Sequence, residues 1–183
     1  MATLDSIRKS LLEIELQPIK DGIRGESIAL IHFEEIDQPF IHVHQEDWSK
    51  PQKLVAINGK RPDFYLLPLD VNFIMVDVKY HSIGVDERFT LEHDEIEKYK
   101  NLIDYTVNTQ KIAREKIQLK LFIIPKEHNG QSYIIIDFHE YLSDTHLHDI
   151  NIKYDNKIHK VRYVDLKNKL KKIMTVSDPY LHQ

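Results

Sequence analysis

Two short stretches decide how this chain is interpreted: Lys60-Arg61-Pro62-Asp63 and Phe73-Ile74-Met75-Val76-Asp77-Val78-Lys79. We expect both to be β-strands that form a hairpin, because residues 68–72 between them are rich in turn-forming residues and have a suitable length for such a connection. If Leu67 pairs with Phe73, the odd length of this linker puts Asp63 directly opposite Asp77. The sequence therefore predicts two carboxylates side by side on one face of a sheet.

The predicted pair of carboxylates needs a compensating charge. Cross-strand neighbours on one face have Cβ atoms about 5 Å apart, and two ionised carboxylates at that separation repel. Lys79 lies two residues beyond Asp77, so it projects from the same face of the strand. The remaining positions of both strands are apolar on both faces. A charged cluster at one end of an otherwise apolar sheet is a candidate functional site.

The composition favours one soluble domain. With 183 residues, 42% of them hydrophobic, the chain can bury a single core, for which we expect residues 25–138, followed by a basic extension over residues 150–183. It contains no run of about 20 apolar residues and no N-terminal signal-peptide pattern, so we expect a cytoplasmic protein without a membrane partner. The absence of cysteine excludes disulfides, thiolate zinc sites and cysteine nucleophiles.

Charge is distributed unevenly along the chain. The formal net charge of -4 argues against a general nucleic-acid coat protein. Residues 151–183 nevertheless carry eight lysines and arginines against three aspartates, or +5, which leaves -9 for the remainder. Such an asymmetry suits a basic arm beside an acidic site, although a solvated lysine-rich face has the same composition. Lys167 and Lys171 in this extension are therefore candidates for contacts with a substrate.

Hydrophobic periodicity predicts the other elements. We expect a helix ending near Leu16, a loop over residues 21–25, and a second helix over residues 26–36, for which a strand over 27–33 is the alternative. Strands are expected at 41–45, 51–57, 118–125 and 133–138, with Asn58-Gly59 as a hairpin turn and 81–89 as a polar stretch. A helix begins near residues 90–93, and the C-terminal part holds a hairpin around 155–157 and a short helix over 165–174. This order predicts a mixed sheet flanked by helices.

The motif and the order of elements resemble the PD-(D/E)xK nuclease superfamily. Pro62-Asp63 is similar to the first half of its signature and Asp77-Val78-Lys79 to the second, and the resemblance covers roughly residues 25–125. Asp-x-Lys also occurs at 155–157 and 165–167, but only the copy at Asp77 follows a Pro-Asp and lies in a predicted strand. The resemblance implies an α/β restriction-endonuclease-like fold, with a mixed β-sheet flanked by helices and the core order α-β-β-β-α-β.

The resemblance also implies a metal-dependent reaction. Asp63, Asp77 and the Val78 carbonyl would bind Mg²⁺, for which Mn²⁺ can substitute, and Glu26 at a helix start resembles the extra acidic ligand of the family. Glu34 and Glu35 are rivals of Glu26, and a glutamate at a helix start commonly just complements the helix dipole. Lys79 would orient or deprotonate a water molecule or stabilise the charge of the transition state.

Four other residues are weaker candidates near the site. Glu95, with Tyr99 one turn later, resembles a polar position of the family on the helix after the lysine, but a solvated acid in a first helical turn fits as well. Arg61 could touch a phosphate or form an ion pair at the strand end, and His81 lies close enough to contact substrate. The His42-x-His44 and His146-x-His148 pairs have no companions that would complete a zinc site.

The leading hypothesis from sequence is a nuclease that hydrolyses phosphodiester bonds of DNA in restriction, recombination, repair or mobile-element processing. Two alternatives stay open: an RNA-cleaving nuclease, and a non-catalytic nucleic-acid-binding or assembly module with a nuclease-like fold. Many members of the superfamily dimerise to cut two strands, so a homodimer is also compatible with the resemblance.

Overall fold

The computed structural model of the protein describes residues 19–45, 49–68, 72–143, 148–154, 157–167, 169 and 171–172. The predicted first helix, ending near Leu16, lies outside these residues. The helices are α2 (Ile19–Glu35), α3 (Gln52–Ala56), α4 (His93–Gln110) and α5 (Phe138–Ser143), with 3₁₀ turns η2 (Arg114–Lys116) and η3 (Lys126–His128). The strands are β1 (Phe40–His42), β2 (Phe64–Leu66), β3 (Phe73–His81), β4 (Arg88–Glu92), β5 (Ile117–Pro125), β6 (Ser132–Asp137), β7 (His148–Tyr154), β8 (Lys157–Asp165) and β9 (Lys171–Lys172).

The main sheet is mixed. Its six strands follow the order β1-β2-β3-β5-β6-β9, in which β3 and β5 are parallel and every other neighbouring pair is antiparallel. The parallel pair requires a crossover, and β4 together with α4 supplies it. A second, three-stranded sheet has the order β4-β8-β7. The predicted hairpin around residues 155–157 is confirmed by the antiparallel pairing of β7 with β8.

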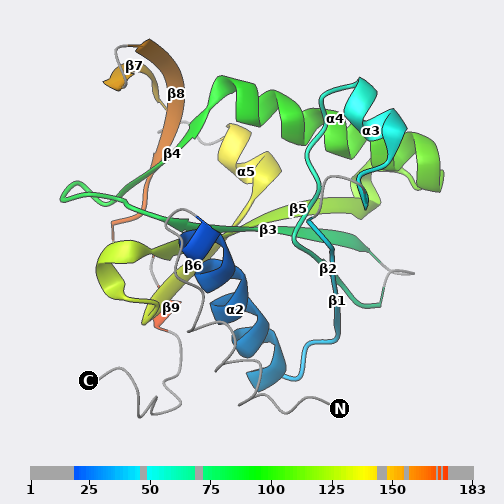
Figure 1. Ribbon diagram of the computed structural model, residues 1–183, viewed down its shortest axis with the longest axis horizontal. Coiled ribbons are helices and arrows are strands. Elements are labelled where there is room, and N and C mark those ends of the chain that lie inside the picture. Colours follow the sequence, from blue (N-terminus) through cyan, green and yellow to red (C-terminus); the bar gives the residue numbers. More distant parts are fainter. Residues whose placement is uncertain are drawn as a thin grey trace.

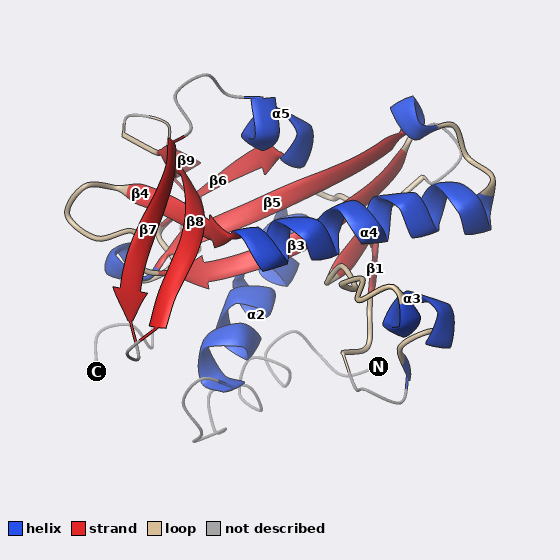
Figure 2. Ribbon diagram, turned by 90° about the horizontal axis from the view of Figure 1, so that it is seen from above, coloured by secondary structure: helices blue, strands red, loops and turns tan. Residues whose placement is uncertain are grey.

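Helices cover both faces of the main sheet, as the sequence predicts. Figure 1 shows α2 below the sheet and α4 with α5 above it, and Figure 2 shows α4 running across β3 and β5. The molecule is thus a mixed α/β protein with a mixed sheet flanked by helices. Among the described residues, no helix has the length and apolar character that crossing a bilayer requires.

Two hydrophobic cores lie on opposite faces of β3. The first, below the sheet, joins α2 to the even-numbered residues of the central strands and contains Ala29, Phe33, Phe64, Val76, Phe122 and Ile124. The second and larger core joins α4 and α5 to the odd-numbered residues and includes Phe73, Met75, Ile96, Tyr99, Leu102, Leu119, Leu121, Ile123, Phe138 and Tyr141. Alternation along β3 therefore assigns each residue to one of two helical layers.

The predicted register between β2 and β3 is confirmed. Phe64 pairs with Val76 and Leu66 pairs with Ile74, a register that directs Asp63, just before β2, toward Asp77. The predicted strand over residues 60–63 is wrong, because β2 begins only at Phe64. Ahead of β2, the backbone N–H of Asp63 donates to the Val76 carbonyl at 2.8 Å.

The prediction of a loop over residues 21–25 is wrong, because these residues form the first turns of α2. Gly25, which falls in this predicted loop, lies where α2 meets β3. A Cβ atom at this position would lie 2.8 Å from the Cβ of Tyr80 and 3.3 Å from a methyl carbon of Val78. Gly25 therefore permits close helix–sheet packing, a role that a glycine can have without breaking a helix.

The predicted strand over residues 51–57 is also wrong, since Gln52–Ala56 form α3. Asn58-Gly59 does not make a hairpin turn. Asn58 has a φ of 53°, and the N–H of Gly59 donates to the Leu54 carbonyl at 2.9 Å, which closes the end of the helix. Asparagine and glycine suit this left-handed helix terminus as well as they suit a hairpin, so the dipeptide alone does not distinguish the two.

Two further predictions need correction. The polar stretch over residues 81–89 contains the end of β3, a turn and the start of β4, which the sequence reading missed. The predicted helix over residues 165–174 is not formed in its described part, where β8 extends to Asp165 and Lys171–Lys172 form β9. Pairing with β4 and β6 holds these segments in extended conformations despite their helical pattern of leucines.

Candidate active site

Asp77 is the centre of the predicted charged cluster. It lies in the middle strand of the sheet, and its side chain is only 1% exposed. The Lys79 ammonium lies 3.0 Å from the Asp77 Oδ2 atom, so the two side chains share one face as the strand periodicity predicts. Burial would raise the pKa of Asp77, but Lys79, Lys60 and the Tyr99 hydroxyl more than offset this effect and lower it. Asp77 is therefore held as a carboxylate.

Asp63 has the opposite electrostatic state. Its Oδ2 atom accepts a hydrogen bond from the backbone N–H of Val78 at 2.6 Å, which fixes the side chain against β3. Burial, followed by the negative charge of Asp77, raises its pKa to about 7. A carboxyl group with this pKa is half protonated at neutral pH, as expected for two close carboxylates that lack a sufficient cation between them.

Glu95 and Tyr99 are brought into the cluster by α4. They lie one helical turn apart, so both side chains point at the end of β3. The buried Tyr99 hydroxyl donates to Asp77 Oδ2 at 2.6 Å. Lys79 and Lys60 form ion pairs with Glu95 and lower its pKa to about 2 although burial acts in the opposite direction. Glu95 is thus part of the cluster and not merely a solvated residue of the first turn.

Lys60 is the residue that the sequence reading missed. Its ammonium lies 3.0 Å from Asp77 Oδ1, 2.9 Å from Glu95 Oε1 and 3.1 Å from the Tyr99 hydroxyl. It belongs to the segment between α3 and β2, where its own N–H donates to the Lys98 carbonyl at 3.2 Å. Its position three residues before Asp63 was the only available signal, because a lysine outside a strand has no predictable facing.

Glu26 approaches the cluster from the other layer. It lies next to Gly25 on α2, where the close packing on β3 carries it toward the end of the sheet, and its charge contributes to the raised pKa of Asp63. Its Oε2 atom lies 2.8 Å from His42 Nε2, and the His42 ring stacks on Phe64 at 4.9 Å. One member of the His42-x-His44 pair therefore pairs with an acid, whereas His146 and the side chain of His148 lie outside the described residues.

Arg61 does not have the surroundings that the sequence predicts, and His81 only adjoins the cluster. Arg61 is buried, and its guanidinium donates to the Ser49 hydroxyl and the Gln45 carbonyl. It therefore ties the segment before α3 to the strand end and does not present itself to a substrate. His81, at the end of β3, has its pKa lowered by desolvation and by the charges of Lys79 and Lys126.

Lys167 and Lys171, the two lysines of the basic extension that are predicted to contact a substrate, are not among the residues of the cluster. Lys167 follows β8 as an exposed residue, next to Leu166, whose N–H donates to the Glu87 carbonyl at 2.8 Å. This position is at the opposite end of β4 from α4 and Glu95. Lys171 pairs with Tyr133 through its backbone, and its side chain is outside the described part of the chain.

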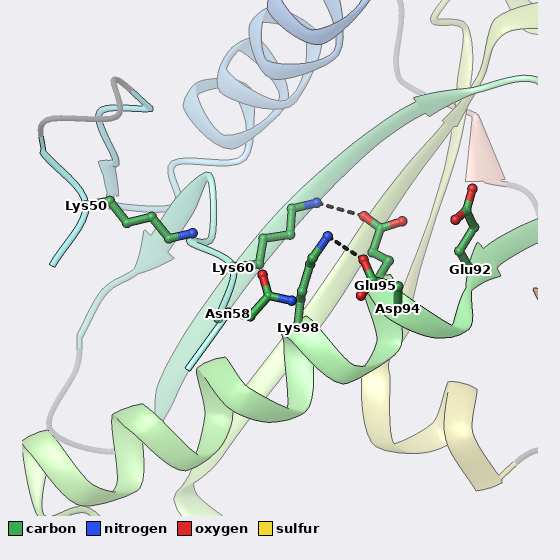
Figure 3. A pocket seen from close by; sticks show the side chains of 8 residues that line it. Lys50, Asn58, Lys60, Glu92, Asp94, Glu95 and Lys98 are labelled. Atoms are coloured by element: carbon green, nitrogen blue, oxygen red, sulfur yellow. Dashed lines mark hydrogen bonds and ion pairs between the residues drawn. The ribbon is translucent and has the colours of Figure 1, made fainter. Parts of the chain in front are cut away.

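A cavity of about 500 Å³ opens beside the cluster. Figure 3 shows Lys60 and Lys98 on one side of it, with Lys50 reaching toward them from the segment before α3. Lys98 forms an ion pair with Asp94 at 2.5 Å, one turn away on α4. The lining residues are Lys50, Asn58, Gly59, Lys60, Glu92, Asp94, Glu95 and Lys98. Of the charged cluster, Lys60 and Glu95 line this cavity, whereas Asp77 lies buried behind them.

The donor atoms of the cluster suit a hard divalent cation in an open site. Within the described residues, no three histidine, aspartate or glutamate side chains are grouped closely enough to form a complete metal site. Two carboxylates, Asp63 and Asp77, do meet, and Asp77 Oδ1 is buried without a well-oriented hydrogen bond from any described residue. Mg²⁺ is commonly bound by only one or two carboxylates together with water and substrate phosphate, so this donor set fits it.

Comparisons with known proteins give no match: no family model, no curated protein and no solved structure corresponds to this chain.

Proposed function

We propose that the protein is a metal-dependent nuclease of the PD-(D/E)xK superfamily that hydrolyses phosphodiester bonds of DNA. The observation that carries the proposal is the meeting of Asp63, Asp77 and Lys79 at the end of two paired strands. Support also comes from the element order α2, β1, β2, β3, α4, β5, which is the helix-strand-strand-strand-helix-strand order expected of a restriction-endonuclease-like core, with α3 and β4 as additions.

The balance of charge supports a cation in this site. With Asp63 ionised, three carboxylates in the cluster, Asp63, Asp77 and Glu95, face the two ammonium groups of Lys60 and Lys79. One negative charge is left over. Burial contributes most to the raised pKa of Asp63, and the charge of Asp77 adds to it. A divalent cation held by Asp63, Asp77 and the Val78 carbonyl would remove this repulsion, with Glu26 on the same side.

Each side chain has a role in the proposed reaction. Bound Mg²⁺ or Mn²⁺ would polarise the scissile phosphate and activate a water molecule for attack. Lys79 is held against Asp77 and Glu95 with 17% of its side chain exposed, so it can donate to a phosphate oxygen or orient that water. Tyr99 fixes Asp77 through its hydroxyl, and Glu95 fixes both lysines.

A cleavage assay tests the proposal. Supercoiled, linear, single-stranded and branched DNA, and RNA, are incubated with the full chain with and without Mg²⁺ or Mn²⁺, beside Asp77→Ala and Lys79→Ala. We expect metal-dependent cleavage that both substitutions abolish. Lys120→Ala is the matched control, because Lys120 is also a strand lysine paired with an aspartate, Asp137, at 3.0 Å. Cleavage that survives both site substitutions would refute the assignment, and cleavage of RNA alone would change the substrate.

A second candidate function is a non-catalytic nucleic-acid-binding or assembly module. It is favoured by one observation: Lys60 and Lys79 already neutralise Asp77 and Glu95, as in a structural network of ion pairs. Such a module would bind the same DNA in a mobility-shift assay without cutting it in any metal. Sedimentation analysis in the same buffers would show whether the protein acts as the homodimer that two-strand cleavage commonly uses.

A further inference from the structure

Lys60 occupies an unusual position for a surface lysine. Three functional groups of the cluster lie within 3.1 Å of its ammonium: Asp77, Glu95 and the Tyr99 hydroxyl. The ammonium also lies 5.0 Å from the centre of the Tyr99 ring, within the range of a cation–π contact. Two carboxylates, those of Asp77 and Glu95, thus lie at ion-pair distance from this one ammonium. Lys60 is therefore a firmly charged cation at the carboxylate that a metal would need.

The contact between Lys60 and Asp77 Oδ1 is one that another cation can replace. The two atoms are 3.0 Å apart, yet this oxygen receives no well-oriented hydrogen bond from the described residues. Asp77 Oδ2, by contrast, accepts hydrogen bonds from the Tyr99 hydroxyl at 2.6 Å and from Lys60 at 3.3 Å, and it lies 3.0 Å from Lys79. Oδ1 is thus satisfied by charge alone, and charge is what a divalent ion supplies more strongly.

Lys60 also has space into which it can withdraw. It precedes β2 in a segment outside the strand ladder, and its side chain lines the cavity of about 500 Å³ together with Lys50 and Lys98. Figure 3 shows its ammonium turned toward Glu95. Lys79 has no comparable freedom at its backbone, because it lies inside β3 and pairs with Ile123 of β5.

We infer that Lys60 competes with the divalent cation for the Asp77 carboxylate and withdraws into the adjoining cavity when that cation binds. The inference rests on the proposed function, because it assumes that Asp77 is a metal ligand. Lys60 then keeps the cluster neutral before the metal arrives and weakens metal binding in return. A divalent ion bound to Asp77 Oδ1 would repel the Lys60 ammonium, which lies 3.0 Å from the same oxygen, more strongly than a single charge does.

Isothermal titration calorimetry with Mg²⁺ and Mn²⁺, in the absence of nucleic acid, tests this competition. The full chain is compared with Lys60→Met, which keeps the side-chain length and removes the charge, and with Lys98→Met, which alters the same cavity but not the cluster. We expect Lys60→Met to bind the metal about tenfold more tightly or better. Lys98→Met should remain within about twofold of the wild type. Unchanged or weaker binding by a folded Lys60→Met would overturn the inference.

Amine labelling of the wild type gives a second readout that needs no variant. The protein is treated with an acylating reagent with and without Mg²⁺, and each lysine is quantified by mass spectrometry. Lys60 should become at least about threefold more reactive with the metal, whereas Lys120, paired with Asp137, should not change. If metal binds and the labelling of Lys60 stays constant or falls, the inference is wrong. If neither wild type nor Lys60→Met binds any metal, the proposed function itself fails.

Discussion

The two faces of β3 differ although a helix covers each of them. Toward α2, the strand presents Val76 to a core of aromatic rings, in which Phe33 packs edge-on against Phe64 and Phe122. Toward α4, the same strand begins with Met75 in an apolar core and ends with Asp77 and Lys79. The first face stabilises the fold. On the second face, close carboxylates lower the stability of the fold, which is typical of functional sites.

The largest expected effect comes from the charged face. Asp77→Asn keeps the size of the side chain but removes the charge, so we expect cleavage to fall by about a thousandfold or more, equivalent to about 4 kcal/mol in activation free energy. Initial cleavage rates measure the loss. Far-ultraviolet circular dichroism should show unchanged secondary structure, and a variant with near-normal rates would separate Asp77 from the chemistry.

The apolar face should behave in the opposite manner. Phe33→Ala removes a buried ring that contacts Phe64 and Phe122, so it should lower the free energy of unfolding by about 3 kcal/mol. The cleavage rate per folded molecule should remain within about twofold. Urea unfolding and rate measurements at low temperature test the two statements separately, and a large loss of activity in the folded variant would contradict the separation of the faces.

Asp63→Asn should make the protein more stable at pH 8, by roughly 1 to 3 kcal/mol, while it abolishes metal-dependent cleavage. The folded pKa of Asp63, about 7, lies above its ordinary value of 3.8. Between these values the folded state binds more protons than the unfolded state, so this group's contribution to stability falls as the pH rises through that window. The cost is complete above pH 7.

The pH dependence of the stability gain distinguishes the loss of the Asp63 charge from a general effect of replacing aspartate with asparagine. Urea unfolding at pH 4 and pH 8 should show a larger gain for Asp63→Asn at pH 8 than at pH 4. Asp137→Asn, in the half-buried pair with Lys120, is the control and should show no such difference. For the wild type, metal binding should strengthen between pH 6 and pH 8 as Asp63 loses its proton. An equal gain in stability for Asp63→Asn at both pH values would show that the pKa of Asp63 is not raised in the folded state.

Gly25→Ala should have a smaller effect, which lowers both the stability of the fold and the rate of cleavage. The added methyl would lie 2.8 Å from the Cβ of Tyr80, so α2 has to move away from β3, with an expected cost of about 1 to 2 kcal/mol. The shift also moves Glu26, and we expect cleavage to fall severalfold. Gly22→Ala is the matched control on the same helix, because a Cβ there has no neighbour within 4 Å among the residues described.

The smallest effect is expected at Lys167. It is exposed and lies at the far end of β4 from Glu95, so Lys167→Gln should change stability by less than about 0.5 kcal/mol. The affinity for DNA, measured by fluorescence anisotropy in Ca²⁺, should change by less than about twofold. A larger loss would mean that the basic extension contacts the substrate after all.

The strand that carries the site could be predicted, because a period of two and an odd linker determine which residues share a face. Asp63, Asp77 and Lys79 follow from that argument alone. Glu95 and Tyr99 could be named from the sequence, but their position could not be predicted. Helical spacing shows that they share one face of the helix, but it does not show which element that face contacts. Their position depends on the packing of α4 across β3, a contact distant in sequence.

The wrong predictions concern residues that are compatible with two different local structures. Asn58-Gly59 fits a hairpin and a helix end equally, and Gly25 fits a loop and a close helix–sheet contact. Lys60 could not be placed because its segment lacks a period, so only the folded chain shows that its ammonium reaches Asp77. For Gly25 and Lys60 the deciding contacts, with β3 and Asp77, lie far away along the sequence.

The register between β2 and β3 also constrains how this chain could change during evolution. One residue gained or lost inside the paired segments 64–66 or 74–76 would shift the residues beyond it to the opposite face and so separate the two carboxylates. A residue added in the connection between the strands leaves that pairing intact. Changes of length should therefore be tolerated between the strands and not within them, and a library of insertions across residues 60–80 would show activity lost only where the paired segments are altered.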